Sequence, residues 1–282
     1  MRIDTGGLRL VVTDYAPGER MDPHWHDVTT VGMVLRGGVE ERVAGREHQA
    51  TAGGFVVKPA GTVHANRFGP AGARMASIGP RNGAHPWEMA DVAGLAVWRW
   101  MDGGPAPRAL WRLLRTASED PSLGGALLAD GFWEMMDALE DDGTTPVPRS
   151  DAPGWLRRVR DRLHDEREKA PRVRDLAEAA GVHPVSLARA FRRAYGVPVT
   201  EYARRLRVRA AADRVASTGL PLARVALEAG FADQAHLTRE LRRETGITPG
   251  ALRRVASLPA TSPPGSRSSP TSPQTTGGGW HC

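Results

Sequence analysis

The sequence predicts a multidomain α+β protein in which an antiparallel β-barrel precedes a helical connector and an all-α domain. Three observations lead to this fold class. Short β-rich runs separated by Gly and Pro fill residues 1–90. Amphipathic helical patterns follow over residues 91–140, and one helix-turn-helix pattern occurs twice within residues 154–256. A chain of 282 residues is long enough to bury the cores of two domains.

The β-rich runs of residues 1–90 are LRLVV, VGMVLRG, EERVAG and GFVVKPAG. They are rich in residues that favour strands, and the turn residues between them recur at regular spacing. This pattern is typical of an antiparallel barrel or a jelly roll.

Residues 91–140 contain two amphipathic helical patterns, in which apolar residues recur three and four positions apart. Pro121 lies between them and suits the start of a helix. Two such helices can cover the open face of the β domain or form the interface of a homodimer, and the sequence leaves both open. The apolar positions are Leu110, Leu113 and Leu114 in the first pattern, and Leu127, Leu128, Phe132, Met136 and Leu139 in the second.

Two segments carry no periodic pattern. Residues 141–153 read DDGTTPVPRSDAP and are expected to be a linker. Residues 257–282 are rich in Ser, Thr, Pro and Gly and are expected to be disordered.

The helix-turn-helix pattern within residues 154–256 has two copies. The first reads DLAEAAGVHPVSLARAFRRAYG and the second reads RVALEAGFADQAHLTRELRRETG, with a turn that is one residue longer. Leu187 and Leu237 are fifty residues apart, as are the closing residues Gly196 and Gly246. Two copies in register, joined by a helix at residues 200–218, predict a domain with two helix-turn-helix units.

In each unit the second helix is predicted to have one packed stripe and one free stripe. Leu187, Phe191 and Tyr195 face inward in the first, and Leu237 and Leu241 in the second. The outward residues of the first helix are Val185, Ser186, Ala188, Arg189, Arg192 and Arg193, and those of the second are Gln234, Ala235, Thr238, Arg239, Arg242 and Arg243.

Charge separates the two halves of the chain. Residues 1–150 hold 15 basic and 19 acidic side chains, whereas residues 151–256 hold 22 and 13, a net charge of +9. A basic domain indicates a polyanionic partner such as nucleic acid, although a solvated charged surface gives the same count. Four arginines, at positions 204, 205, 207 and 209, crowd the polar side of the connecting helix, opposite Leu206 and Val215.

Residues 155–254 resemble the DNA-binding domain of the AraC family of bacterial transcription regulators. The stretch PLARVALEAGFADQAHLTRELRRETGITPGALRR matches the family signature. The departures concern packing: Pro198 lies one place early, and leucines at positions 237, 241 and 252 stand where the family has aromatic residues.

The resemblance implies that the two second helices enter successive major grooves on one face of double-stranded DNA. Arg189 and Arg239 match the positions best suited to base contact, since Arg pairs bidentately with guanine. An ion pair between Arg239 and Glu244 is the alternative for that residue. A next tier of contacts comprises Val185, Ala188, Gln234, Ala235 and Thr238, and Arg192, Arg193, Arg242 and Arg243 are expected to hold phosphates.

Two stretches of the first domain, PGERMDPHWHDVTTVGMVLRGG and GGFVVKPAGTVHAN, resemble the two motifs of cupin barrels. In metal-binding cupins the positions of His24, His26 and His64 are ligands, together with a Glu that is missing here because its place falls at Thr30 or Val31. Three imidazoles still suffice for a zinc-like or iron-like ion.

The missing Glu favours two alternatives, in which the histidines line a pocket for a small organic effector or simply pack. A divalent metal is therefore not the favoured cofactor. His48 and His85 are single histidines in loop-like contexts and are expected to be structural or exposed. Further residues with a weaker claim to a pocket are Arg9, Arg36, Trp25, Trp87 and Trp98.

These features predict a DNA-binding transcription regulator that is controlled by a small effector in the cupin-like domain and is not an enzyme. Its expected partners are double-stranded DNA, the effector, a second copy of the chain in a homodimer, and RNA polymerase. The alternative is a metal-dependent cupin enzyme fused to a DNA-binding module, against which the incomplete ligand set argues. A DNA alkyl-repair activity needs a nucleophilic Cys, and the sole cysteine is Cys282 at the end of the tail.

The expected location is the cytoplasm. No run of the sequence approaches the roughly 20 apolar residues of a membrane span, and the first residues lack the apolar core of a signal peptide. A single cysteine also excludes a disulfide framework within the chain.

Overall fold

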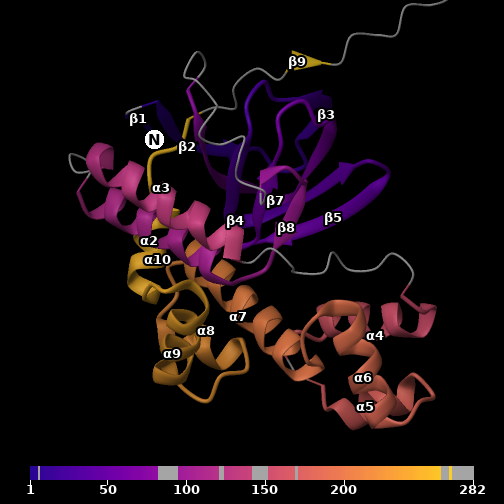
Figure 1. Cartoon of the computed structure of the whole chain (residues 1–282). Coiled ribbons are helices and arrows are strands. Elements are labelled where there is room, and N and C mark those ends of the chain that lie inside the picture. The colour runs from indigo at the N-terminus through magenta and orange to yellow at the C-terminus, as the bar shows by residue number, and fades with distance from the viewer. Residues whose placement is uncertain are drawn as a thin grey trace, which may run out of the picture.

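The computed structural model of the chain describes residues 1–5, 7–81, 95–120, 124–141, 152–168, 171–261 and 267–268. Within these ranges nine strands form one antiparallel sheet in the order β1-β2-β7-β4-β6-β8, with β3 beside β7, β5 beside β4, and β9 beside β3 (Figure 1). The strands are β1 Arg2–Thr5, β2 Leu8–Tyr15, β3 Arg20–Trp25, β4 Thr30–Val43, β5 Arg46–Thr51, β6 Phe55–Lys58, β7 His64–Pro80, β8 Arg99–Met101 and β9 Arg267–Ser268.

The curved sheet confirms the antiparallel β domain, but its strands are longer than the sequence pattern indicates. The runs VGMVLRG and EERVAG belong to one strand, β4, rather than two. Two irregularities in the pairing of β4 with β7 explain the break in the pattern, because they bend the strand without ending it. Gly37 lies at one of them with φ of 74°, and any side chain there would overlap the backbone of Gly72.

Two helices of the connector, α2 Pro105–Glu119 and α3 Gly124–Asp141, pack on each other and against the sheet. Leu110, Leu114 and Phe132 are fully buried in the same core as Leu10 and Val31 of the sheet. The structure therefore places these helices over the β domain, which is one of the two alternatives that the sequence leaves open. Pro121 lies outside the described residues.

In the described residues of the C-terminal domain, seven helices follow. Gly at the turn residues 181 and 230, with φ of 66° and 75°, ends the first helix of each helix-turn-helix unit as the sequence predicts. The helices are α4 Gly154–Asp165, α5 Val173–Ala179, α6 Pro184–Tyr195, α7 Val199–Ser217, α8 Leu222–Glu228, α9 Gln234–Thr245 and α10 Pro249–Ala256. No helix in the described ranges has the length and apolar character needed to cross a membrane.

The two helix-turn-helix units belong to different hydrophobic cores. In the first unit, α4, α5, α6 and the beginning of α7 share a core that contains Leu156, Leu187 and Phe191. In the second unit, residues such as Val225 and Leu237 continue the core of the sheet, α2 and α3. Helix α7 spans both cores, so the second unit is packed on the β domain and the first extends away from it (Figure 1).

The beginning of the segment 257–282 is ordered, contrary to the expectation of disorder. Leu258 is buried, and the backbone N–H of Thr261 donates to the carbonyl of Val12 at 2.8 Å. Strand β9 pairs with β3 at His24 and Trp25. Composition does not predict this packing, because a single apolar residue and backbone hydrogen bonds hold the segment in place. The rest of the tail and most of the expected linker lie outside the described residues.

Candidate nucleic-acid interface and sensor site

Helix α6 of the first unit begins and ends at strong capping residues. The ring nitrogen Nδ1 of His183 accepts from the backbone N–H of Val185 at 3.3 Å, and Pro184 occupies the first helical position. Gly196, with φ of 76°, ends the helix and donates its N–H to the carbonyl of Arg192 at 2.9 Å. Leu187 is fully buried, which fixes the opposite face of α6 toward solvent.

Helix α9 of the second unit is built in the same way from different residues. Asp233 accepts the backbone N–H of His236 at 2.6 Å, and Gly246, with φ of 77°, ends the helix. Leu237 and Leu241 are fully buried beneath it. Each unit thus presents one rigid helix with a packed stripe and a free stripe.

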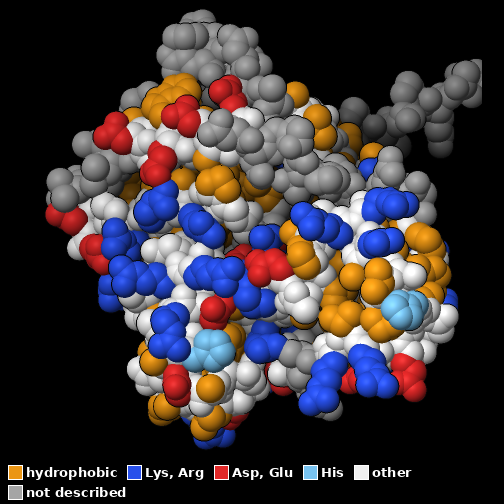
Figure 2. All heavy atoms as spheres, turned by 60° about the horizontal axis from the view of Figure 1, so that its bottom comes forward, with side chains coloured by type: hydrophobic (Ala, Val, Ile, Leu, Met, Phe, Trp, Pro, Cys, Tyr) orange, Lys and Arg blue, Asp and Glu red, His pale blue; other side chains and the backbone are white. Residues whose placement is uncertain are grey.

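The predicted DNA-contacting residues lie on these free stripes. Val185, an apolar side chain, is 49% exposed. Thr238 is the exception, because it is half-buried and its hydroxyl donates to the carbonyl of Gln234 at 2.8 Å. Figure 2 turns the helical end of the molecule forward and shows Lys and Arg side chains spread across it. The exposed members are Val185, Ser186, Ala188, Arg189, Arg192, Arg193, Gln234, Ala235, Arg239, Arg242 and Arg243.

Arg189 and Arg239 have no carboxylate within ion-pair distance among the described residues. The alternative that pairs Arg239 with Glu244 is wrong, because Glu244 contacts Arg204 at 2.7 Å and Arg205 at 4.0 Å. Both candidate base-reading arginines therefore keep their guanidinium donors available. Beside Arg189 and Arg192, a groove of 290 Å³ runs between α6 and the start of α7.

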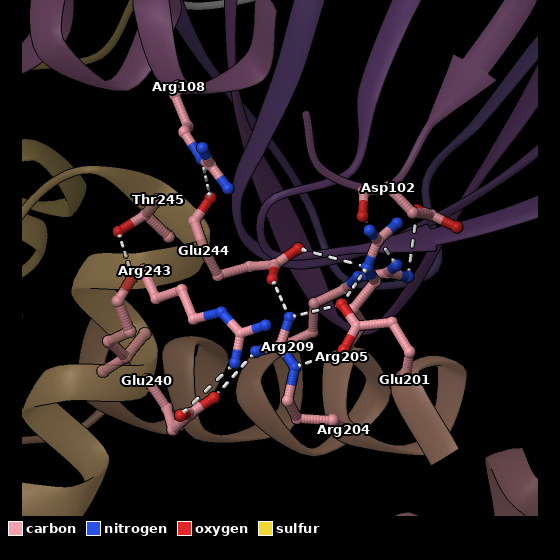
Figure 3. Close-up of polar contacts among 11 residues, drawn as sticks. Asp102, Arg108, Glu201, Arg204, Arg205, Arg209, Glu240, Arg243, Glu244 and Thr245 are labelled. Carbon is pink, nitrogen blue, oxygen red and sulfur yellow. Dashed lines mark hydrogen bonds and ion pairs between the residues drawn. The ribbon is translucent and has the colours of Figure 1, made fainter. Parts of the chain in front are cut away.

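The arginines of the connecting helix have internal partners. Arg204 contacts three carboxylates, two of which lie on α9 and join it to α7. Arg209 pairs with Asp102 of the N-terminal half at 2.9 Å (Figure 3). Arg207 lies over the ring of Phe231, 5.9 Å from its centroid. Net charge alone therefore overstates the basic surface. The partners of Arg204 are Glu201 at 2.7 Å, Glu240 at 2.8 Å and Glu244 at 2.7 Å.

The three histidines of the first domain come together. His24 on β3 pairs with His64 on β7, and His26 follows directly after β3. The ring centroids of His24 and His64 are 4.2 Å apart, and one ligand nitrogen from each of the three rings lies within 4.8 Å of the others. A single ion with bonds of about 2.0–2.1 Å to nitrogen needs its ligands about 3.3 Å apart, so small side-chain movements would bring the three imidazoles onto one ion.

The hydrogen bonds of these rings also suit a ligand set. Nδ1 of His24 lies 2.7 Å from the carbonyl of Asp22, and Nδ1 of His64 lies 3.1 Å from that of Thr62. An imidazole that donates from Nδ1 keeps Nε2 as a lone-pair donor for a metal. Nε2 of His64 is buried and has no partner among the described residues. Burial lowers the pKa of His64 to about 2 and that of His26 to about 4, so both rings are neutral at pH 7.

Thr30 and Val31, where the cupin resemblance would place the carboxylate ligand, pair with Lys58 and Val57 of β6. Sequence reasoning missed a different carboxylate, Glu41, which is fully buried on β4. Glu41 pairs with Asn66 in the register in which Val43 pairs with His64, so both strands aim alternate residues at one interior. The donors to Glu41 are Lys58 Nζ at 2.6 Å, Asn66 Nδ2 at 2.9 Å, Trp98 Nε1 at 3.1 Å and Trp100 Nε1 at 2.7 Å.

Of the weaker pocket candidates, Trp98 lies at the histidines, with its ring centroid 4.5 Å from that of His64. His48 lies on strand β5 rather than in a loop and stacks on Trp100 at 5.0 Å. The arginines at positions 9 and 36 pair instead with Asp4 and Asp14. Trp25 pairs through its backbone with Arg267, and residues 85 and 87 lie outside the described ranges.

Comparison with known proteins gives a match for each half of the chain. Residues 176–255 match the family described as "Helix-turn-helix domain", and residues 11–75 match the "Cupin domain". The HTH-type transcriptional activator AarP of Providencia stuartii is 33% identical over 79 residues, which are 28% of this chain and 58% of that protein. The chain thus spans little more than half the length of this relative.

Among solved structures, ToxT of Vibrio cholerae O395 is 8% identical and covers 89% of this chain and 99% of its own, with a TM-score of 0.38. The C-terminal domain of AraT, a response regulator of Geobacillus stearothermophilus, is 24% identical. It covers 37% of this chain and 88% of its own, with a TM-score of 0.35. Taken with the two capped helices and the paired histidine strands, the family matches show that the chain joins a cupin domain to a helix-turn-helix domain.

Proposed function

We propose that the chain is a sequence-specific DNA-binding transcription regulator whose cupin domain binds a small effector. One observation carries the proposal: two separately capped helices, α6 and α9, each bury one face and expose an arginine-bearing face. Two such helices joined by a third suit two major-groove contacts on one face of double-stranded DNA. The curated relative is named as a transcriptional activator, which supports the same function and RNA polymerase as a partner.

Within this proposal the outward residues have distinct roles. Arg189 and Arg239 are free of carboxylate partners in the described structure and read guanine edges. The arginine pairs 192–193 and 242–243 close each helix and hold phosphates. Because α6 offers Pro184 and Ala188 where α9 offers Gln234 and Thr238, the two helices read different half-sites, and one chain recognises an asymmetric sequence.

The test begins with selection of bound sequences from random DNA, followed by titration of the selected operator at fixed salt. Arg189→Ala and Arg239→Ala should each weaken specific binding by about 1–3 kcal/mol and relax the preference at one position. Arg42→Ala is the matched control, because Arg42 is an exposed arginine of the sheet that pairs with Glu47. Unchanged affinity and discrimination in both variants would overturn the assignment.

We further propose that the effector binds at the interior that His24, His26 and His64 share with Trp98, and that a divalent metal can be part of it. The three neutral rings fit the metal, and the unpartnered Nε2 of His64 supports this. A bound ion would supply a positive charge and an open coordination position for an anionic or carbonyl oxygen. Glu41 is held by four donors and so is not a free acid or base, which supports a sensor over an enzyme.

We also propose a homodimer, in which Trp133, 39% exposed on α3, is the candidate contact. Sedimentation with and without operator DNA tests it, and a monomer at micromolar concentration in both conditions would contradict it.

A further inference from the structure

The segment 98–103, named here the coupling segment, leaves the interior of the cupin domain and ends at the second helix-turn-helix unit. At its start the ring of Trp98 lies against His64, and its Nε1 donates to Glu41 at 3.1 Å. Two residues later Trp100 donates to the same carboxylate at 2.7 Å. Because Glu41 is fully buried, these two bonds tie the segment to the interior in which the histidines lie.

At its other end the coupling segment contacts α7 and α9. Asp102 pairs with Nη1 of Arg209 at 2.9 Å, and its carbonyl accepts from Nη2 of the same residue at 3.1 Å (Figure 3). Gly103, with φ of 119°, faces Glu244 so closely that a Cβ at this position would overlap Oε1 of that carboxylate. Residues of the coupling segment, α2, α7 and α9 line a cavity of only 20 Å³, about the space of one water, so this junction is a contact rather than a ligand site.

Glu244 is the residue of α9 that faces the coupling segment. It is 8% exposed and lies in the last turn of the helix, where the helix dipole and burial both disfavour a carboxylate. Arg204 of α7 compensates at 2.7 Å, and Nε of Arg108 on α2 donates to the carbonyl of Glu244 at 3.3 Å. The C-terminal turn of α9 therefore takes its position from α2, α7 and the coupling segment together.

We propose that the coupling segment transmits a structural change inside the cupin domain to α9. Effector binding then changes the affinity for the second half-site of the operator and leaves the affinity for the first unchanged. This rests on the proposed function. The separate cores support it, because the second unit continues the core of the cupin domain, whereas the buried residues of α4, α5 and α6 form their own. Trp98, Asp102 and Gly103 are positioning residues in this scheme and touch no DNA.

Two neighbouring glycines give a matched test. Gly103 and Gly104 have φ of 119° and 111°, so alanine strains the backbone at both, but only position 103 faces Glu244 and position 104 has open space. Gly103→Ala should weaken binding to the selected operator by roughly 2- to 30-fold relative to Gly104→Ala. The difference should vanish on an operator whose second half-site is scrambled and persist when the first is scrambled.

A second pair of variants tests the proposal if Gly103→Ala fails to fold, which circular dichroism would reveal. Asp102→Asn removes the charge that pairs with Arg209 without backbone strain, and Asp161→Asn removes the partner of Arg160 within α4 of the first unit. Only Asp102→Asn should lower protection of the second half-site in footprints, and Trp98→Phe should do the same.

Equal effects of the paired variants, or a loss that persists when the second half-site is scrambled, would overturn the proposal. A wild-type chain that selects no DNA sequence would refute the proposed function itself, which is a different result.

Discussion

Single residues at the histidine site show where sequence spacing suffices and where it fails. The H-x-H and P-x-G-x-x-H spacings place His24, His26 and His64 together, as predicted from the cupin resemblance. Glu41 could not be found this way, because its importance comes from four donors on three other segments of the chain. The one local signal is that Glu41 and Val43 share a strand face, which marks Glu41 as a polar residue among inward positions.

The histidine site makes a prediction at the residue scale. Equilibrium dialysis with Zn²⁺ alone should show a tight site in the wild type that His64→Ala weakens by at least roughly 100-fold, because a ligand is lost. His48→Ala is the control, since Nε2 of His48 also lacks a partner among the described residues but its ring stacks on Trp100 away from the other rings. Equal zinc affinity in His64→Ala and the wild type would leave the three rings with no role in metal binding.

At the level of helices and strands, the predictions that rest on capping residues hold best. The turn glycines at 181, 196, 230 and 246 all adopt the left-handed conformation and mark helix ends. Strand limits were predicted less well, because β4 passes through two bulges and β7 continues over 17 residues that include three glycines. The sequence shows that the alternation of apolar and polar residues is lost at a bulge. It does not show the neighbouring strand whose pairing continues on both sides of the bulge.

The N-cap of α9 makes the prediction at this scale. Asp233→Ala should lower the free energy of unfolding by about 1 kcal/mol, because the N–H of His236 loses its acceptor and the helix loses a negative charge at its N-terminus. Asp233→Asn keeps an acceptor and should cost only a few tenths of that, roughly 0.3 kcal/mol. Urea denaturation of the three proteins measures both effects, and equal losses for Ala and Asn would contradict a capping role.

For the whole molecule, the sequence indicates two domains but not how they are joined. The domain boundaries predicted from the sequence follow changes in composition. In the structure, however, the cupin domain, the connector helices and the second unit share one hydrophobic core. The basic charge of α7 suggests a DNA-facing helix, yet Arg204 and Arg209 are used to join α7 to α9 and to Asp102. Such long-range pairs follow from the tertiary fold, which places residues about a hundred positions apart in contact.

The Arg204 cluster gives the whole molecule a predictable response to acid. Hydrogen bonding from Arg204 lowers the pKa of Glu201 to about 2 from 4.5, so the charged carboxylate is favoured in the folded state. The resulting stability is fully present above pH 4.5 and is lost as the pH falls from 4.5 toward 2. Arg204→Met leaves three carboxylates without their shared cation and should cost about 2–3 kcal/mol at pH 7, less than a fully buried pair because Arg204 keeps some solvent contact.

Urea unfolding of wild type and Arg204→Met at pH 7 and at steps between pH 4.5 and 3 measures this response. The difference between the two proteins should shrink as the pH falls, because protonation of Glu201 removes in the wild type the contribution that the variant already lacks. Arg160→Met is the control, since Arg160 pairs with the exposed Asp161 on α4 of the first unit. If the free energy of unfolding had the same pH dependence in wild type and Arg204→Met, the contacts of Arg204 with Glu201 would not contribute to the acid response.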